Sequence, residues 1–311
     1  MNQWQLYIMD NLKFKAWVNA ARLRTLPLAL SSSLMGSFAA FQDGRFKWNV
    51  FGLALLTTLF LQILSNLAND YGDSVNGADN AERVGPARAV QSGNISATSM
   101  KTAVIITSVF AFISGILLIG AGVGYSNWLP WLVFILIGLL AISAAILYTA
   151  GSNPYGYKGF GDLFVFLFFG ITAVFGTYYL HTGTLRALAL LPAVTIGFLS
   201  TAVLNLNNMR DIEGDARSGK RTMVVLMGSY YAKLYHFVMV IGAMVAITIW
   251  SVLHYTSYWQ FIILLSLPLF ARHLLVVLRN KVPAALDPQL RILALSIFVL
   301  VLLFGTGVLL S

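Results

Sequence analysis

The sequence contains little charge. Only 10% of its 311 residues are charged and 58% are hydrophobic, whereas a soluble domain carries roughly 25% charged residues. This shortage excludes an ordinary soluble domain and predicts that lipid contacts most of the exterior. No Pro/Ser-rich or highly charged linker divides the chain. We therefore expect one integral-membrane domain over residues 1–311.

Cysteine is absent, which excludes disulfides, thiolate catalysis and Cys-ligated zinc or iron–sulfur centres. The four histidines are scattered, without HExxH spacing. The net charge of +9 would suggest nucleic acid in a soluble protein. Here it indicates basic loops on one side of a bilayer, and we expect no nucleic-acid partner.

No signal peptide is recognisable at the start, where residues 1–21 mix apolar side chains at helical spacing with lysines. This pattern predicts an amphipathic segment that lies in the membrane interface, with a poorly ordered tail as the alternative. Beyond it, apolar runs of about 20 residues predict an all-α polytopic bundle of nine transmembrane helices. The runs fall near 25–42, 48–69, 102–124, 129–150, 160–181, 186–207, 234–254, 258–279 and 289–310.

The basic residues give the bundle a direction. Nine spans put 17 of the 20 lysines and arginines on the side of the N-terminal segment and leave Arg45, Lys47 and Arg186 opposite. The positive-inside rule makes the first side cytoplasmic. We therefore expect a multi-pass membrane protein with its C-terminus outside.

Two similar acidic motifs follow the second and sixth runs. The first reads Asn69-Asp70-Tyr71-Gly72-Asp73 with Asp79 beyond it, and the second reads Asn207-Asn208-Met209-Arg210-Asp211 with Asp215 beyond it. Four spans separate the motifs, so both must lie at the same membrane face. Solvated loop acids are the alternative, which we accept for Glu82, Glu213 and Asp43.

These residue types suit a divalent cation and a phosphate. Mg²⁺ takes carboxylates, waters and substrate phosphate oxygens in preference to a closed protein cage. Asp211 and Asp215 are four residues apart, so one helical face would carry both. Arg88, Arg210 and Lys220 can neutralise the remaining phosphate charge. The motifs therefore predict a Mg²⁺–diphosphate site at the cytoplasmic face.

The motifs carry a resemblance. NDYGD with Asp79, and NNMRDIEGD followed by GKRT, resemble the signature motifs of the UbiA superfamily of intramembrane aromatic prenyltransferases. SNLANDYGDSVNGAD, RVGPARAVQSGNIS, LYTAGSNPYGYKGFGDLFVFLFFG and AVLNLNNMRDIEGDARSGKRTMVV are similar to the bacterial 1,4-dihydroxy-2-naphthoate polyprenyltransferases of menaquinone synthesis. The similarity runs from about Arg22 to beyond the sixth span, and only hydrophobicity is shared over the last three. The resemblance implies a protein of the bacterial inner membrane.

The resemblance implies a reaction between a long polyprenyl diphosphate and dihydroxynaphthoate. Mg²⁺ would activate the diphosphate, aromatic walls would shield the allylic cation, and the ring would attack through its carboxyl-bearing carbon, losing CO₂ and giving demethylmenaquinone. In the family pattern Asn69, Asp73 and Asp79 match the first motif and Asp211 and Asp215 the second; Asp70 is a further acid of the naphthoate branch, expected at the metal. The candidate wall residues are Tyr71, Tyr148, Tyr155 and Phe160.

Two basic residues also match family positions. Lys158 corresponds to a lysine near the diphosphate, although a plain loop lysine is the alternative. Arg22 would hold a diphosphate oxygen or the acceptor carboxylate, with a lipid headgroup contact as the alternative.

Two other functions remain open. The first is a UbiA-type transferase that uses another acceptor, such as homogentisate, 4-hydroxybenzoate or a haem. The second is a transporter, whose acids would usually lie near the bilayer midplane.

Overall fold

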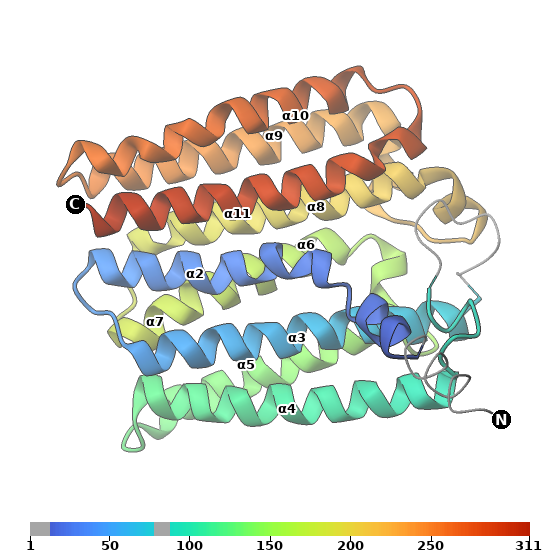
Figure 1. Ribbon diagram of the computed structural model, residues 1–311, viewed down its shortest axis with the longest axis horizontal. Helices are drawn as coiled ribbons and strands as arrows, with labels where there is room; N and C mark the ends of the chain where they lie inside the picture. Colours follow the sequence, from blue (N-terminus) through green and yellow to red (C-terminus); the bar gives the residue numbers. More distant parts are fainter. Residues whose placement is uncertain (1–12, 78–87) are drawn as a thin grey trace, which may run out of the picture.

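The computed structural model describes residues 13–77 and 88–311, and within these ranges it contains helices and no strand. The long helices run side by side along one axis (Figure 1). The first half of the chain contains η1 (Leu23–Thr25), α2 (Leu26–Gln42), α3 (Trp48–Val75), α4 (Ala97–Val123) and α5 (Trp128–Leu147).

The second half begins with the short helix η2 (Tyr155–Lys158). One span is then built from α6 (Gly161–Val165), the π-helix η3 (Phe166–Phe175) and α7 (Gly176–Thr182). The remaining elements are η4 (Ala187–Ala189), α8 (Leu190–Arg217), α9 (Met223–Leu253), η5 (Tyr258–Ser266), α10 (Leu267–Arg279), η6 (Pro283–Leu286) and α11 (Asp287–Leu309).

Within the described residues, eight helices are long and apolar enough to cross a membrane. The ninth expected run corresponds to α2, which has 17 residues and lies alongside these spans (Figure 1). Its small residues Ser31, Ser32, Ser33 and Gly36 lower its hydropathy. They are buried, and small residues of this kind let neighbouring membrane helices approach closely. The protein is therefore an all-α, multi-pass membrane bundle, as the apolar runs predicted.

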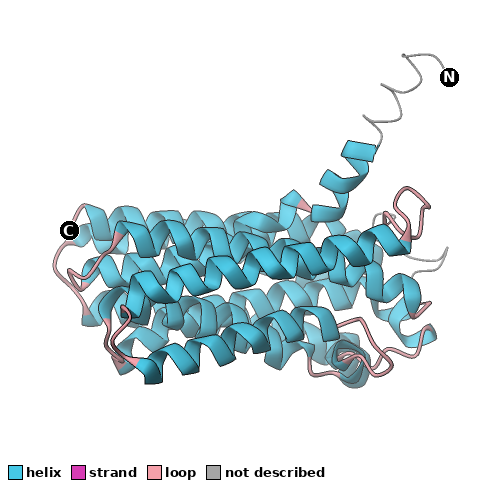
Figure 2. Cartoon of the chain, turned by 90° about the horizontal axis from the view of Figure 1, so that it is seen from below, coloured by secondary structure: helices cyan, strands magenta, loops and turns pink. Residues whose placement is uncertain are grey.

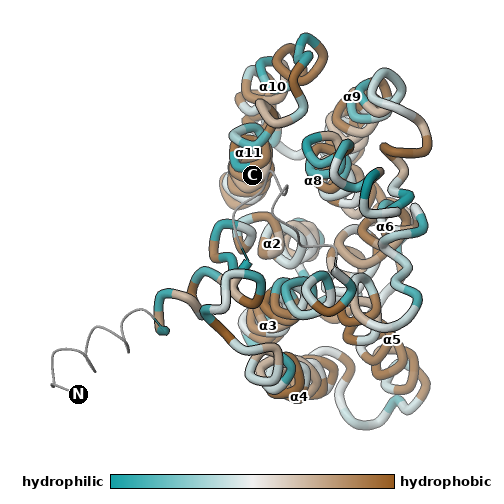
Figure 3. Tube along the Cα trace, turned by 90° about the vertical axis from the view of Figure 1, so that its right-hand side faces the viewer, coloured by the Kyte–Doolittle hydropathy of each residue, from teal (hydrophilic) through white to brown (hydrophobic). Residues whose placement is uncertain are grey.

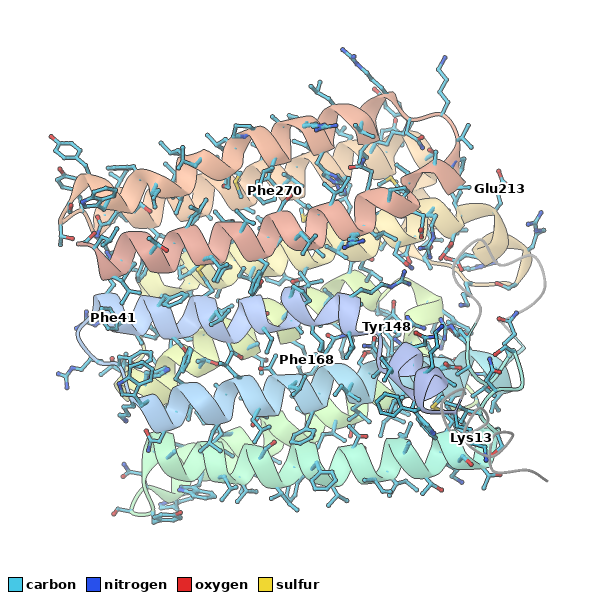
Figure 4. All side chains as sticks on the ribbon, in the orientation of Figure 1. Lys13, Phe41, Tyr148, Phe168, Glu213 and Phe270 are labelled. Atoms are coloured by element: carbon cyan, nitrogen blue, oxygen red, sulfur yellow. The ribbon has the colours of Figure 1, made fainter. Side chains whose placement is uncertain are left out.

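Lys13, where the described residues begin, and the C-terminus lie at opposite ends of the bundle (Figures 1 and 4). Residues 13–21 form a helix that leaves the bundle at an angle (Figure 2), and Ala16 and Ala20 pack against α3. Residues 1–12 of the expected amphipathic segment lie outside the described residues. The C-terminus lies at the other end (Figure 1). This arrangement agrees with an odd number of crossings.

Several helices continue well past the apolar runs. The run near 48–69 ends where the first motif begins, yet α3 continues to Val75, and α8 continues past its run to Arg217. Hydropathy marks how far lipid reaches along a helix, and it does not mark where helical hydrogen bonding stops. Both acidic motifs therefore lie on the last turns of long helices.

Helix α9 is also longer than predicted. It begins at Met223, where the apolar run suggested a start near residue 234, and it is broken at Gly228. Gly228 adopts φ 77°, a conformation that residues with a Cβ rarely adopt. The residues of α9 before Gly228 are therefore separated by a kink from the long remainder of the helix.

Helix α2 occupies the middle of the bundle (Figure 3). The largest core cluster joins α2, η3 and α7 to α8–α11, and a second cluster joins residues 16–20 to α3, α4 and the 89–95 segment. Helix α5 contributes little to either cluster, since Ala144 is its one buried residue. Helix α5 therefore lies at the periphery of the bundle.

The end opposite the motifs carries its own polar contacts. Asp43, which we expected to be a solvated loop acid, is 6% exposed, and its carboxylate lies 3.2 Å from Arg186. Tyr178 donates a hydrogen bond of 2.5 Å to the same carboxylate. The expectation for Asp43 was wrong, because the α2–α3 turn folds back onto α7.

Candidate active site

The first motif lies on the last two turns of α3. The side-chain oxygen of Asn69 accepts a hydrogen bond of 3.1 Å from Thr149, and its carbonyl accepts one from Arg88. Gly72 faces the same segment, and a Cβ at this position would lie 2.5 Å from Thr149 Oγ1. The motif glycine therefore allows α3 to contact the chain that follows α5.

Asp70 has a different environment from the one we expected. It is 2% exposed, and its two carboxylate oxygens accept the backbone N–H groups of Ala89 (3.0 Å) and Val90 (3.2 Å). A carboxylate that accepts backbone N–H groups in this way fixes a loop. The geometry therefore favours a positioning role for Asp70, holding the segment that carries Arg88, over the metal-ligand role that we predicted.

Asp73 is surrounded by donors from three other segments. Arg88 lies 2.5 Å from Asp73 Oδ2, Lys220 Nζ lies 3.3 Å from Oδ1, and the Tyr157 hydroxyl also donates to Oδ1. The carboxylate is 2% exposed. Because a buried carboxylate requires compensating cations and donors, Asp73 is the point at which the loops around the first motif converge.

The second motif lies on the last turns of α8. Arg210 is 3% exposed and donates to both oxygens of its neighbour Asp211, at 2.8 and 2.6 Å. It also donates to Asp287 at the start of α11 (2.6 Å) and to Asn207 (2.9 Å). Of the two motif asparagines, Asn207 is half-buried and Asn208 is buried.

Lys220 joins the two motifs. Its ammonium lies 3.3 Å from Asp73 and 4.0 Å from Asp215, and it stacks over the Tyr157 ring at 4.6 Å. A single positive charge thus reaches a carboxylate of each motif. The predicted convergence of the motifs is present in the structure, at the end of the bundle where Figure 4 labels Glu213 and Lys13.

The donor set fits a hard divalent cation, since carboxylates from two helices lie around one ammonium. No three His, Asp or Glu side chains within 13–77 and 88–311 converge on one point. A metal ion there would take its remaining ligands from water and a diphosphate, as Mg²⁺ prefers. Asp79 lies outside the described residues.

An apolar cavity of about 340 Å³ begins at the first motif and runs between α3, α4, α5 and η3. Its lining on α3 extends from Asn69 to Ala54, which at 1.5 Å per residue spans about 22 Å. Tyr148 lies near the motif end and Phe168 farther along the bundle (Figure 4). The cavity is thus narrow, long and apolar, with its polar residues at one end.

Two of the four expected wall residues line this cavity. Tyr148 and Tyr155 are in edge contact, with centroids 5.4 Å apart, and burial raises the pKa of both phenols. Both rings therefore stay neutral and present aromatic faces and edges. The other two residues are absent from the lining: Tyr71 packs against the cluster around Leu64 and Leu67, and Phe160 is 52% exposed.

The two basic residues matched by resemblance differ in their surroundings. Lys158 is exposed at the end of η2, and its neighbour Tyr157 is the residue of this turn that contacts Asp73. Arg22 is half-buried at φ 50°, an unusual conformation for a residue with a Cβ. Adjacent Ala21 accepts a hydrogen bond of 2.9 Å from Asn66, which lines the cavity.

Sequence reasoning missed three contacts of the site, those of Thr149, Tyr157 and Asp287. Tyr157 lies in the quoted NPYGYKGFGD segment, so attention to that segment alone would have included it. Asp287 is an isolated acid before an apolar run, outside both motifs.

The comparisons with known proteins agree with this geometry. The model of the UbiA prenyltransferase family matches residues 29–293. The chain belongs to the UbiA prenyltransferase family. It is thus a membrane enzyme of the UbiA prenyltransferase class, as its two motifs indicated.

Two bacterial relatives span nearly the full length. A Haemophilus influenzae protein named 1,4-dihydroxy-2-naphthoate octaprenyltransferase is 42% identical over 97% of this chain and 98% of its own. The Escherichia coli protein of the same name is 41% identical over 96% of both chains. These relatives support an aromatic prenyltransferase of menaquinone synthesis.

Solved structures support the fold. A UbiA homologue from Aeropyrum pernix K1 superposes with a TM-score of 0.68 at 15% identity, covering 93% of this chain and 98% of its own. A homologue from Archaeoglobus fulgidus bound to GPP and Mg²⁺ gives 0.59 at 15% identity, covering 95% and 100%.

Proposed function

We propose that this enzyme transfers a long polyprenyl group from a polyprenyl diphosphate to 1,4-dihydroxy-2-naphthoate, with loss of diphosphate and CO₂. The single observation that carries the proposal is the placement of Lys220, which bridges Asp73 and Asp215 where the long apolar cavity begins. A charged head and a long apolar tail fit this junction of polar cluster and cavity. The names of the two long relatives supply the acceptor.

The residues divide the work according to their positions. Asp73, Asp211 and Asp215 would hold Mg²⁺, which neutralises the diphosphate and makes it a better leaving group. Arg88 and Lys220 lie beside Asp73 and place positive charge near the departing oxygens. Arg210, expected to contact phosphate, uses four of its five N–H donors on Asp211, Asp287 and Asn207, so its main role is within the protein.

The tail lies in the cavity, which excludes water from the allylic carbon. As the C–O bond to diphosphate breaks, the diphosphate departs with the electron pair, and the rings of Tyr148 and Tyr155 stabilise the allylic cation. The carboxyl-bearing ring carbon forms the new C–C bond. Its bond to the carboxylate then breaks as CO₂ leaves, and that electron pair restores the aromatic ring of the quinol form of demethylmenaquinone.

An acceptor screen tests the proposal. Purified protein is supplied with Mg²⁺, a labelled polyprenyl diphosphate and, in parallel, dihydroxynaphthoate, 4-hydroxybenzoate or homogentisate. We expect a prenylated product from dihydroxynaphthoate alone, with one CO₂ released from its labelled carboxyl per product. Transfer to another acceptor would show that this acceptor, and not the naphthoate, is the substrate. Uptake of a solute without transfer would instead support a transporter.

We further propose that the motif end of the bundle faces the cytoplasm. The connections at the opposite end hold Arg45, Lys47 and Arg186 and no other lysine or arginine. A reporter fused after Ser311 should therefore report the external side. A cytoplasmic signal from that fusion would reverse the orientation.

A further inference from the structure

The ion pairs of Arg210 extend beyond the second motif. Its guanidinium is 3% exposed and contacts two carboxylates, that of Asp211 in the motif and that of Asp287, which begins α11. Asp287 lies 77 positions away along the chain, is 42% exposed, and comes within 2.6 Å of Arg210. Two acids on different helices therefore share one buried cation.

In this arrangement a metal ion at the second motif would compete with Arg210 for the carboxylate of Asp211. Both oxygens of Asp211 accept from Arg210, so a metal ion that takes the lone pairs directed at these N–H groups must displace at least one of them. Arg210 would then be a buried cation with less compensation, which is strongly unfavourable. This free-energy cost is smaller if a second carboxylate stays paired with the same guanidinium.

Asp287 is well placed to be that second carboxylate. It stands in the first turn of α11, where the helix dipole stabilises a negative charge. Its bond is to Nη1 of Arg210, whereas Asp211 takes Nε and Nη2. The two acids therefore do not compete for one N–H, and Asp287 can stay bound while Asp211 turns away.

We propose that Asp287 is a positioning residue that retains Arg210 and so frees Asp211 for the metal–diphosphate complex. The proposal rests on the proposed function, because it assumes a divalent cation at the motifs. It also gives the start of α11, which lies outside both motifs, a part in the site.

A Mg²⁺ titration tests it directly. The full chain is purified in detergent with a farnesyl thiolodiphosphate, an unreactive donor analogue, and the unfolding temperature is followed as Mg²⁺ is added. Asp287→Asn should weaken the apparent Mg²⁺ affinity by about tenfold or more, since the acceptor of the Arg210 hydrogen bond loses its negative charge. Asp287→Glu should recover at least part of the affinity.

A double-mutant cycle separates positioning from general damage. If Asp287 acts through Arg210, Asp287→Asn should have little further effect on Mg²⁺ affinity in an Arg210→Gln background. Asp43→Asn is the matched control, because Asp43 also pairs with an arginine, at the opposite end. Asp43→Asn should change the unfolding temperature without Mg²⁺ and should leave the apparent Mg²⁺ affinity unchanged.

The outcomes are distinct. Unchanged or tighter Mg²⁺ binding by Asp287→Asn, with normal binding by the parent, overturns the role of Asp287. Absence of Mg²⁺ binding by the parent chain overturns the metal in the proposed function instead. If the asparagine variant unfolds in detergent, Mg²⁺-dependent protection from trypsin in isolated membranes gives the same comparison.

Discussion

Both ends of the bundle contain ion pairs around a buried carboxylate, but the pairs differ in number and in what they adjoin. At the C-terminal end, Asp43 pairs with Arg186 and accepts from Tyr178. At the motif end, Asp73, Asp211 and Asp215 meet Arg88, Arg210 and Lys220 beside a long cavity. A buried carboxylate with a cationic partner therefore does not by itself indicate function, since the pair can simply close a helix connection. Carboxylates from two helices around one cation are the distinguishing feature.

The largest expected effect is loss of a motif carboxylate. Asp73→Ala and Asp211→Ala should each lower turnover by about 10³-fold, because the charge that holds the metal and diphosphate is removed. Asp43→Asn, the acid of the opposite end, should keep turnover near that of the parent. The measurement is product formation with labelled donor, alongside the unfolding temperature of each variant. Retention of more than about a tenth of the activity by either alanine variant would contradict the two-motif site.

The next effect concerns the cation that joins the motifs. Lys220→Met should lower kcat by about 10²-fold, because one positive charge beside the departing diphosphate is lost. Lys47→Met is the control at the opposite end, where the ammonium donates to the carbonyls of Gly122 and Leu180. Steady-state kinetics on both variants check the prediction. Equal losses of kcat would show that the two lysines have the same structural role.

Convergence of Asp73, Asp215 and Lys220 could be predicted from the sequence, because an even number of spans between two motifs returns the chain to the same membrane face. The role of Asp70 could not be predicted, since it depends on the backbone of Ala89, which lies 19 positions away along the chain. The pairing of Arg210 with Asp287 depends on the packing of α11 against α8. Hydropathy also could not show that α3 and α8 remain helical through the motifs.

A smaller effect compares the two ends of α3 itself. A Cβ at Gly72 would meet Thr149 and Ala150, whereas one at Gly52 would meet nothing within 4 Å. Gly72→Ala should therefore cost about 1–3 kcal/mol of stability through overpacking, with some loss of activity as Thr149 moves. Gly52→Ala should raise stability by up to about 1 kcal/mol, because alanine is the better helix former. The unfolding temperatures of the two variants test this prediction. Equal shifts for Gly72→Ala and Gly52→Ala would mean that the motif end of α3 is not tightly packed.

The smallest expected effect concerns acceptor choice, in which Arg22 is our candidate. The donor is held by its diphosphate and its tail, and neither distinguishes one aromatic acceptor from another. A carboxylate leaving water needs a paired cation, and the guanidinium of arginine suits a planar oxyanion. The segment of Arg22 is fixed beside the cavity, since Asn66 donates to Ala21 and to Thr25. Its φ of 50° is maintained by these contacts.

We therefore expect Arg22→Ala to raise the KM for dihydroxynaphthoate by about tenfold, the loss of one hydrogen bond to a charged group, and to change the KM for the donor less. Arg24→Ala, an exposed arginine two residues on, should change neither. A selective rise in the donor KM would assign Arg22 to the diphosphate, and unchanged kinetics would leave it as a lipid headgroup contact. Arg22 and Arg24 would both lie at the membrane interface, so lipid headgroup contacts predict the same small effect on KM from either substitution. Only a role of Arg22 at the cavity predicts that the two variants differ in KM.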